Sequence, residues 1–149
     1  MKKILCVDDD PSLLYLYHEE LSEEGYKVIL AQDGKQAVEK FEEEKPQAVI
    51  MDIRMPGMDG IETMNALLGK DRQIPIILNT AFPDYKQNYM TWGAEAYIIK
   101  SSDLTELKNK IREVLEKRNK LERSSPTTSK NYRKKSRSRP LVEERIGDF

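Results

Sequence analysis

The sequence predicts an α/β protein built on a doubly wound, five-stranded parallel sheet. Five short apolar runs alternate along the chain with segments whose apolar residues recur at helical spacing. The runs are short and rich in β-branched residues, which favours strands over helices. A repeated alternation of this kind predicts right-handed crossovers that place helices on both faces of the sheet.

The expected strands are residues 4–7 (ILCV), 26–31 (YKVILA), 48–51 (AVIM), 74–78 (IPIIL) and 96–99 (AYII). The first, third and fourth are nearly continuous runs of hydrophobic residues, as expected for central strands buried on both faces. The second run is more mixed, which favours an edge position.

The expected helices span residues 11–24, 34–45, 60–70, 83–92 and a last segment from Ser102 or Asp103 to about Leu121. Pro11 is a favoured first-turn residue, and Gly25 is a typical residue for ending the first helix. The segment 83–92 has the least regular helical pattern of the five, which indicates a short or irregular fourth helix.

The chain has 149 residues, enough for one domain and a tail. Its net charge of −1 is unevenly distributed, because residues 122–149 carry 8 Lys/Arg against 4 Asp/Glu. These residues also lack apolar periodicity, so we expect an acidic domain over 1–121 and a basic, disordered tail over 122–149. A tail of this length cannot bury a core of its own, so no output domain is expected in it.

Several residue types exclude other classes of protein. The single cysteine, Cys6, lies in an apolar run and predicts a buried, inert thiol rather than a nucleophile or a disulfide. The single histidine, His18, is expected on the solvent-facing side of the first helix. No apolar stretch is long enough to cross a membrane. We therefore expect a cytoplasmic protein.

Polar residues gather where the expected strands end. Asp8 and Asp9 follow the first strand, Asp52 follows the third, Thr80 follows the fourth and Lys100 follows the fifth. The carboxyl ends of parallel strands meet at one edge of the sheet, which is where ligands bind in this architecture.

Three carboxylates close together repel one another unless a cation binds, and oxygen-only ligands suit Mg²⁺. With a lysine beside them to neutralise phosphoryl oxygens, the favoured reaction is in-line attack by a carboxylate on phosphorus, which gives an aspartyl phosphate. The residue types alone do not select which aspartate attacks. A simpler use also stays open, because Asp8, Asp9 and Asp10 can cap the first helix, and Asp10 directly precedes Pro11.

Four motifs together resemble the receiver domain of two-component response regulators. They are ILCVDDDPS at the start, MDIRMPGMDG in the middle, NTA after the fourth strand and YIIK at the fifth. The resemblance covers residues 1–121 and implies a flavodoxin-like strand order of 2-1-3-4-5. It also implies a protein that accepts a phosphoryl group from a histidine kinase or a histidine phosphotransfer protein and signals to a protein target that the sequence does not identify.

The resemblance also implies a role for each residue at the metal-binding side. Asp52 resembles the phosphoacceptor, and Asp9 matches the direct Mg²⁺ ligand. Asp8 corresponds to the second acid, which acts through water. Arg54 occupies the position whose backbone carbonyl completes the metal sphere.

A second group of residues corresponds to the family's phosphoryl contacts and switch. Thr80 matches the hydroxyl that moves to bind the phosphoryl group, and Lys100 matches the ammonium that pairs with it. Tyr97 falls at the aromatic switch position, although an aromatic residue in a strand can also simply pack in the core. Turning of Tyr97 would remodel the face that many receivers use for output or for a homodimer.

Two features depart from the common family pattern or vary within it. Ser101 stands where a proline with a cis bond usually follows the lysine. A cis bond before a residue other than proline costs about 3 kcal/mol, so we expect a trans bond and a differently shaped loop. Arg54 and Phe82 occupy positions that tune the lifetime of the phosphoryl group, and two bulky residues there predict a long-lived phosphate.

An alternative function is nucleic-acid binding through the basic segment KNYRKKSRSRP, residues 130–140. We favour a solvated tail, because runs of charge are usually that. A flavodoxin-type nucleotide binder is set aside, because the acidic sequence DDDPS stands where a phosphate-binding loop would have to follow the first strand.

Overall fold

The computed structural model describes residues 1–55, 59–83, 88–90 and 92–124. The elements are β1 (Lys3–Val7), α1 (Pro11–Glu23), β2 (Lys27–Ala31), α2 (Gly34–Glu44), β3 (Ala48–Met51), α3 (Gly60–Lys70), β4 (Ile76–Thr80), β5 (Ala96–Ile99) and α4 (Thr105–Ser124). The compact unit Met1–Leu115 contains the whole sheet. The expected domain boundary at residue 121 and the expected disordered tail stay predictions, since residues 125–149 lie outside the described part.

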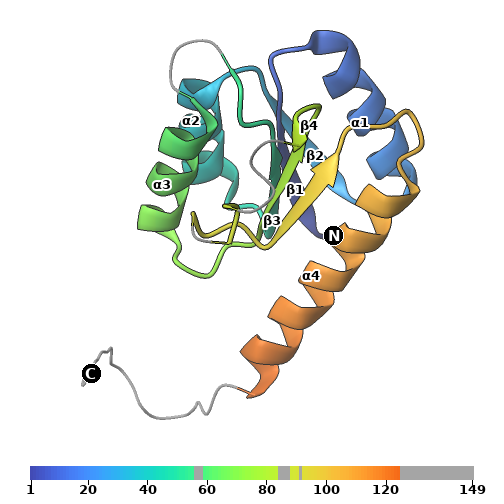
Figure 1. The fold of residues 1–149 in the computed structure, drawn as a ribbon. Coiled ribbons are helices and arrows are strands. Elements are labelled where there is room, and N and C mark those ends of the chain that lie inside the picture. Colours follow the sequence, from blue (N-terminus) through green and yellow to red (C-terminus); the bar gives the residue numbers. More distant parts are fainter. Residues whose placement is uncertain (56–58, 84–87, 91, 125–149) are drawn as a thin grey trace. The chain divides into compact units, whose positions relative to one another are not determined.

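The five strands form one parallel sheet in the order β2-β1-β3-β4-β5, which confirms the predicted fold (Figure 1). Strand β2 lies at an edge, as its mixed sequence predicted. Residues 48–51 of β3 are buried throughout and pair with both β1 and β4. The residue after β3, Asp52, therefore emerges from the middle of the sheet.

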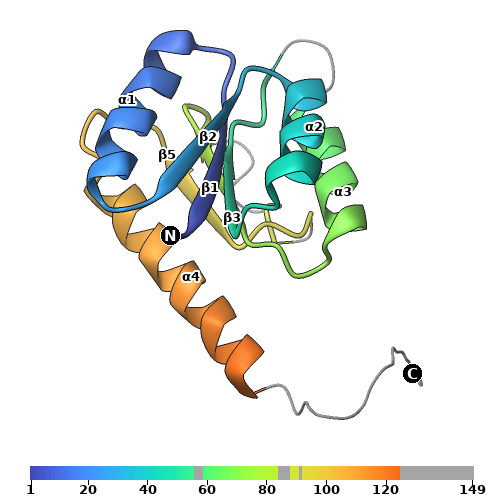
Figure 2. The same cartoon turned by 180° about the vertical axis from the view of Figure 1, so that it is seen from behind.

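Alternate residues of each strand face two separate apolar layers, because side chains alternate across a strand. One layer packs against α2 and α3 and contains Leu5, Val7, Val49, Met51, Ile76, Leu78, Phe41, Met64 and Leu67. The other packs against α1 and the first turns of α4 and contains Ile4, Cys6, Ile50, Ile77, Ile98, Leu14, Tyr17, Leu21, Leu107 and Ile111. Figures 1 and 2 show these helices on opposite faces of the sheet.

Aspartate side chains cap the N-termini of three helices. Asp10 accepts the N–H of Ser12, Asp33 that of Gln36 and Asp59 that of Glu62, and each of these bonds satisfies a donor that the first helical turn leaves free. Capping by Asp10 agrees with the sequence-based expectation.

The expected helix at 83–92 differs most from the structure. Residues 84–87 and 91 lie outside the described part, and the described residues 88–90 and 92–93 form turns rather than a helix. Gly93 adopts a positive φ of 98°, a backbone conformation that favours glycine and ends the turn before β5.

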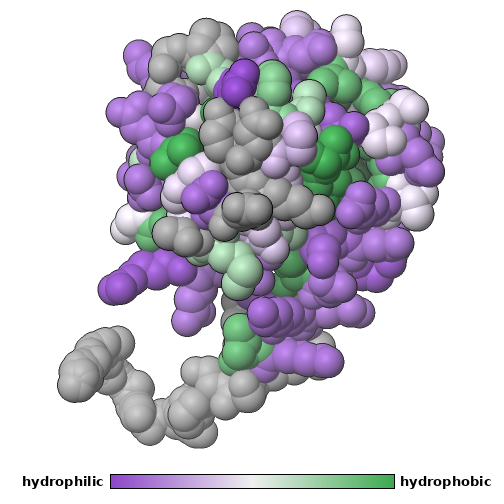
Figure 3. All heavy atoms as spheres, in the orientation of Figure 1, coloured by the Kyte–Doolittle hydropathy of each residue, from purple (hydrophilic) through white to green (hydrophobic). Residues whose placement is uncertain are grey.

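Hydrophilic side chains predominate on the face shown in Figure 3, and the hydrophobic ones form small separate patches. Patches of this size are ordinary on a protein surface. Among the described residues, no helix combines the length and the apolar character that crossing a membrane requires.

Candidate functional site

The three aspartates predicted to meet do lie together at the carboxyl ends of β1 and β3. One carboxylate oxygen from each of Asp8, Asp9 and Asp52 lies within 4.8 Å of the others. Asp8 is 2% exposed and Asp52 is 5% exposed, whereas Asp9 is open to solvent. Two buried carboxylates this close to an exposed one are an unfavourable arrangement without a cation.

Lys100 supplies the positive charge that this cluster needs. Its Nζ lies 2.8 Å from Asp8 Oδ2 and 2.7 Å from Asp52 Oδ2. Burial lowers the pKa of Lys100, but its hydrogen bonds to Asp52 and Asp8 outweigh burial and hold that pKa above the ordinary value. Burial also raises the pKa of Asp8, and the hydrogen bond from Lys100 offsets only part of that rise. Lys100 therefore stays charged and bridges the two buried acids.

The backbone after β3 fixes the position of Asp52. The N–H of Arg54 donates to Asp52 Oδ1 at 3.3 Å, and the N–H of Gly60 donates to the carbonyl of Ile53 at 2.8 Å. A Cβ on Gly60 would lie 2.5 Å from Ile53 Cα and 2.6 Å from the carbonyl oxygen of Asp52. Only glycine allows α3 to begin this close to the acid.

Thr80 is fully buried at the end of β4, and its Oγ1 accepts the N–H of Phe82 at 3.3 Å. Tyr97 is 9% exposed, and its hydroxyl donates to the carbonyl of Phe82. The guanidinium of Arg54 lies 3.8 Å from the centre of the Phe82 ring, a cation–π contact. Phe82 thus contacts three residues that the sequence analysis singled out separately.

Two further buried residues beside the site were not predicted as functional. The Nδ2 of Asn79 donates to the hydroxyl of Tyr17 at 2.8 Å, and both side chains are buried. In the sequence, Tyr17 lies at helical spacing from Leu14 and Leu21, which predicts only a core position. The available signal was Asn79 itself, a polar residue inside an otherwise apolar strand.

Hydrogen bonds from backbone N–H groups to side chains, rather than a proline, fix the shape of the loop after Lys100. No peptide bond among the described residues is cis, so the bond between Lys100 and Ser101 is trans, as expected. Ser101 Oγ accepts the N–H of Asp103 at 3.1 Å, and Asp103 Oδ1 accepts the N–H of Thr105 at 2.9 Å. Despite the changed loop, Lys100 reaches both buried acids.

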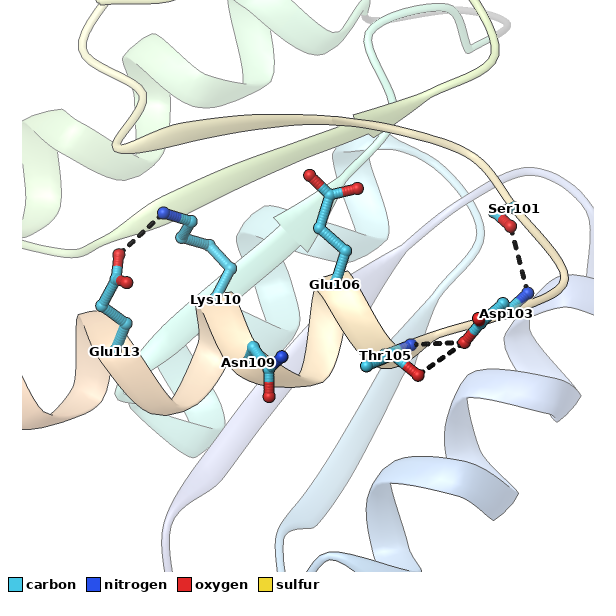
Figure 4. A pocket seen from close by; sticks show the side chains of 7 residues that line it. All are labelled: Ser101, Asp103, Thr105, Glu106, Asn109, Lys110 and Glu113. Atoms are coloured by element: carbon cyan, nitrogen blue, oxygen red, sulfur yellow. Dashed lines mark hydrogen bonds and ion pairs between the residues drawn. The ribbon is translucent and has the colours of Figure 1, made fainter.

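A hollow of about 590 Å³ lies along the first turns of α4 and is lined by Ser101, Asp103, Thr105, Glu106, Asn109, Lys110 and Glu113 (Figure 4). Lys110 pairs with Glu113 there at 2.7 Å. The hollow shares no residue with the carboxylate cluster, so we place the functional site at the cluster and not in this hollow.

Two other sequence-based expectations are confirmed. Cys6 is fully buried, and burial raises the pKa of its thiol to about 12, with a smaller contribution from Asp8. A thiol with this pKa stays protonated and is a poor nucleophile. The side chain of His18 is 47% exposed on α1, as expected for a solvent-facing residue.

The chain belongs to the family of response regulator receiver domains, whose pattern matches residues 4–112. It is 38% identical over 130 residues to the probable transcriptional regulator ycf27 of Guillardia theta, covering 86% of this chain and 51% of that protein. It is 34% identical over 116 residues to sporulation initiation phosphotransferase F of Bacillus subtilis, covering 76% of this chain and 94% of that one. The chain spans about half the length of several relatives named as transcriptional regulators, for example 48% of PhoP of Bacillus subtilis.

Solved structures agree with this assignment. The response regulator TrrA of Thermotoga maritima, in complex with Mg²⁺ and BeF, is 40% identical with a TM-score of 0.72, over 76% of this chain and 99% of that one. TrrA in complex with the histidine kinase ThkA matches at 41% identity and a TM-score of 0.71, over 77% and 99%. The chain is therefore a response regulator receiver domain of two-component signalling.

Proposed function

We propose that Asp52 accepts a phosphoryl group from the phosphohistidine of a histidine kinase or a histidine phosphotransfer protein. The observation that supports this most directly is the position of its carboxylate. It is 5% exposed at the end of a central strand, grouped with Asp8 and Asp9 and hydrogen-bonded to Lys100 at 2.7 Å. The proposal is supported by the meeting of a carboxylate acceptor, two further acids that suit a cation and a lysine ammonium, which are groups that phosphoryl transfer to a carboxylate uses.

The donor set of this site fits Mg²⁺. All three acids contribute carboxylate oxygens within 4.8 Å of one another, and one of them is open to solvent, which leaves room for water ligands. Asp9 and Asp52 would bind the ion directly, Asp8 through water, and the backbone carbonyl of Arg54 would complete the sphere. When bound, Mg²⁺ neutralises the charge that develops on the phosphoryl oxygens.

Lys100 is placed to exchange its ion-pair partners when Asp52 is phosphorylated. Its ammonium is the counter-ion of Asp8 and Asp52, at 2.8 and 2.7 Å. A divalent ion held by these acids would share the same oxygens, which would free Lys100 to pair with an incoming phosphoryl group. The lysine thus serves the resting site first and the phosphorylated site afterwards.

The transfer itself exchanges one bond to phosphorus for another. A carboxylate oxygen of Asp52 forms a bond to phosphorus while the bond between phosphorus and the donor imidazole nitrogen breaks. The imidazole leaves with the electron pair of that bond. Lys100 stabilises the phosphoryl oxygens through its charge, and the Asp52 side chain stays oriented by the N–H of Arg54.

The contacts of Phe82 suggest how phosphorylation reaches the surface. Thr80 Oγ1 accepts the N–H of Phe82, and the carbonyl of Phe82 accepts the hydroxyl of Tyr97. Movement of the Thr80 hydroxyl to the phosphoryl group gives up its bond with the Phe82 N–H, which releases the residue whose carbonyl accepts the Tyr97 hydroxyl. Phosphorylation then shifts the population between two packings of Tyr97, with Thr80 and Tyr97 as the switch pair.

The partner is proposed from a relative, and the location from the sequence. The complex of TrrA with a histidine kinase supports a kinase as phosphoryl donor for this chain as well. We infer a cytoplasmic protein whose receiver domain covers residues 1–121, with the basic tail 122–149 as a solvated segment.

Intact mass spectrometry after incubation with acetyl phosphate and Mg²⁺ tests this function. The wild type is expected to gain one phosphoryl mass, and both Asp52→Asn and incubation with a chelator are expected to prevent the gain. Tyr15→Phe is a matched control, because Tyr15 is 67% exposed on α1 and should leave the gain unchanged. Phosphorylation of Asp52→Asn to the wild-type extent would refute Asp52 as the acceptor.

A further inference from the structure

One hydrogen bond crosses the apolar layer between the sheet and α1. Asn79 on β4 donates through Nδ2 to the hydroxyl of Tyr17 on α1 at 2.8 Å, across 62 positions of sequence. The exposed fractions are 4% for Asn79 and 3% for Tyr17. The neighbouring strand residues on this face, Ile77 and Ile98, are apolar. A polar pair in this layer is costly to bury, and an apolar pair of the same shape would fill the space equally well.

The two residues belong to opposite sides of the functional site. Tyr17 lies on α1, whose N-terminal cap is Asp10. The N–H of Asp10 donates to Asp8 Oδ1 at 3.0 Å, so the start of α1 helps to position Asp8. Asn79 directly precedes Thr80, whose carbonyl accepts the N–H of Lys100 at 2.8 Å. Strand β3 lies between β1 and β4 in the sheet, so these two sides of the site are not neighbours through backbone hydrogen bonds.

We propose that Tyr17 and Asn79 are positioning residues that set the distance between the acids at the end of β1 and the Thr80–Lys100 pair. A directed hydrogen bond fixes one relative placement of α1 and β4, whereas apolar contact tolerates small shifts. The inference rests on the proposed phosphoryl transfer to Asp52, because it assigns the pair a task in that reaction.

The electrostatic surroundings of Tyr17 are consistent with this placement. Burial raises the pKa of the Tyr17 hydroxyl to about 12, and the charge of Asp8 adds to the rise. The hydroxyl therefore stays protonated and uncharged near neutral pH. It keeps the bond to Asn79 without adding a third negative charge beside the buried acids.

The test compares stability with reaction rate in Tyr17→Phe, Asn79→Leu and the double variant. Each single variant leaves one buried polar group without its partner and should lose stability, while the double variant removes both groups and should recover most of it. Unfolding in urea measures this part. If the pair acts only in packing, the phosphorylation rate recovers together with stability in the double variant.

A positioning role predicts a different outcome for the reaction. At saturating Mg²⁺ and acetyl phosphate, the double variant should be phosphorylated roughly tenfold or more slowly than the wild type, because small displacements of reacting groups are costly. Its Mg²⁺ affinity, measured by calorimetry, should stay within about twofold, because Asp8 and Asp52 keep the backbone hydrogen bonds that their N–H groups donate to the neighbouring strands. Tyr15→Phe on the same helix is the matched control and should change neither quantity.

Three outcomes decide the matter. A double variant that is phosphorylated as fast as the wild type refutes the positioning role, and so does a loss of rate that is matched by an equal loss of Mg²⁺ affinity. Wild-type protein that gains no phosphoryl mass refutes the proposed function and this inference with it. If the double variant does not fold, the phosphorylation rate per folded molecule of Tyr17→Phe, which keeps the ring in place, is measured instead, and a rate equal to that of the wild type refutes the positioning role.

Discussion

Gly60→Ala tests whether the start of α3 holds Asp52 in place. The added Cβ would lie 2.5 Å from Ile53 Cα, 2.6 Å from the carbonyl oxygen of Asp52 and 2.7 Å from that of Ile53. All three are backbone atoms, which cannot turn away as a flexible side chain can. The helix must therefore move away from the segment that follows β3, or that segment must move with Asp52.

The expected loss of stability follows from these contacts. Overpacking a tight site costs about 1–3 kcal/mol. Weakening the hydrogen bond from the Gly60 N–H to the carbonyl of Ile53, now 2.8 Å long, adds about 1 kcal/mol. The gain from replacing glycine by alanine in a helix is about 1 kcal/mol at most and is smaller in the first turn. We expect a net destabilisation of about 1–3 kcal/mol.

Gly69→Ala is the matched control in the same helix. A Cβ on Gly69 meets no heavy atom within 4 Å, so that variant should be more stable than the wild type by about 0.5–1 kcal/mol. Urea unfolding of both variants, together with their rates of phosphorylation by acetyl phosphate, measures the contrast. Equal effects of the two substitutions, or a stabilised Gly60→Ala with an unchanged rate, would refute the reasoning.

Three other predictions concern charge and shielding at the site. Lys100→Met leaves the buried acids without their counter-ion and should destabilise the protein by about 3 kcal/mol near neutral pH. Because the fold raises the pKa of Asp8, the free energy of unfolding falls as pH rises from the unfolded value near 3.8 through the folded pKa. Urea unfolding of the variant should therefore show a smaller deficit near pH 4 than near pH 7. Phe82→Ala removes the ring on which Arg54 stacks at 3.8 Å and should shorten the lifetime of the phosphoryl group several-fold, measured by a mass-spectrometric time course; an unchanged lifetime would count against shielding. In the folded protein the Cys6 thiol stays protonated from its ordinary pKa of 9.0 up to about pH 12. The free energy of unfolding should therefore fall by about 1 kcal/mol per pH unit above pH 9, and Cys6→Ala should remove that part of the pH dependence.

Local features of the sequence predicted most of the fold. The short apolar runs correspond to the five strands within two residues, because a strand buried on both faces needs a nearly continuous apolar sequence. The helix caps Asp10 and Asp59 were also predictable, since capping depends on neighbouring residues only. The segment 83–92 was predicted as a helix from a weak pattern, and its described residues form turns.

The candidate site was partly predictable for a topological reason. The ends of parallel strands meet at one edge, so Asp8, Asp9, Asp52 and Lys100 were expected together, and the structure brings them together. The bridging of two buried acids by the lysine was not predicted, because the sequence analysis assigned that ammonium to an anion. The bond between Tyr17 and Asn79 was also missed, since a contact across 62 positions leaves no periodic signal.

The alternation of side chains along β4 sends neighbouring residues to opposite layers of the domain. Asn79 faces the layer that holds α1, while Leu78 and, by alternation, Thr80 face the layer that holds α2, α3 and Tyr97. Two adjacent residues of β4 therefore contact different layers. Asn79 bonds Tyr17 of α1, whereas Thr80 accepts the N–H of Phe82, to whose carbonyl Tyr97 donates. A one-residue shift of β4 would exchange the faces of Asn79 and Thr80 and break both of these contacts at once.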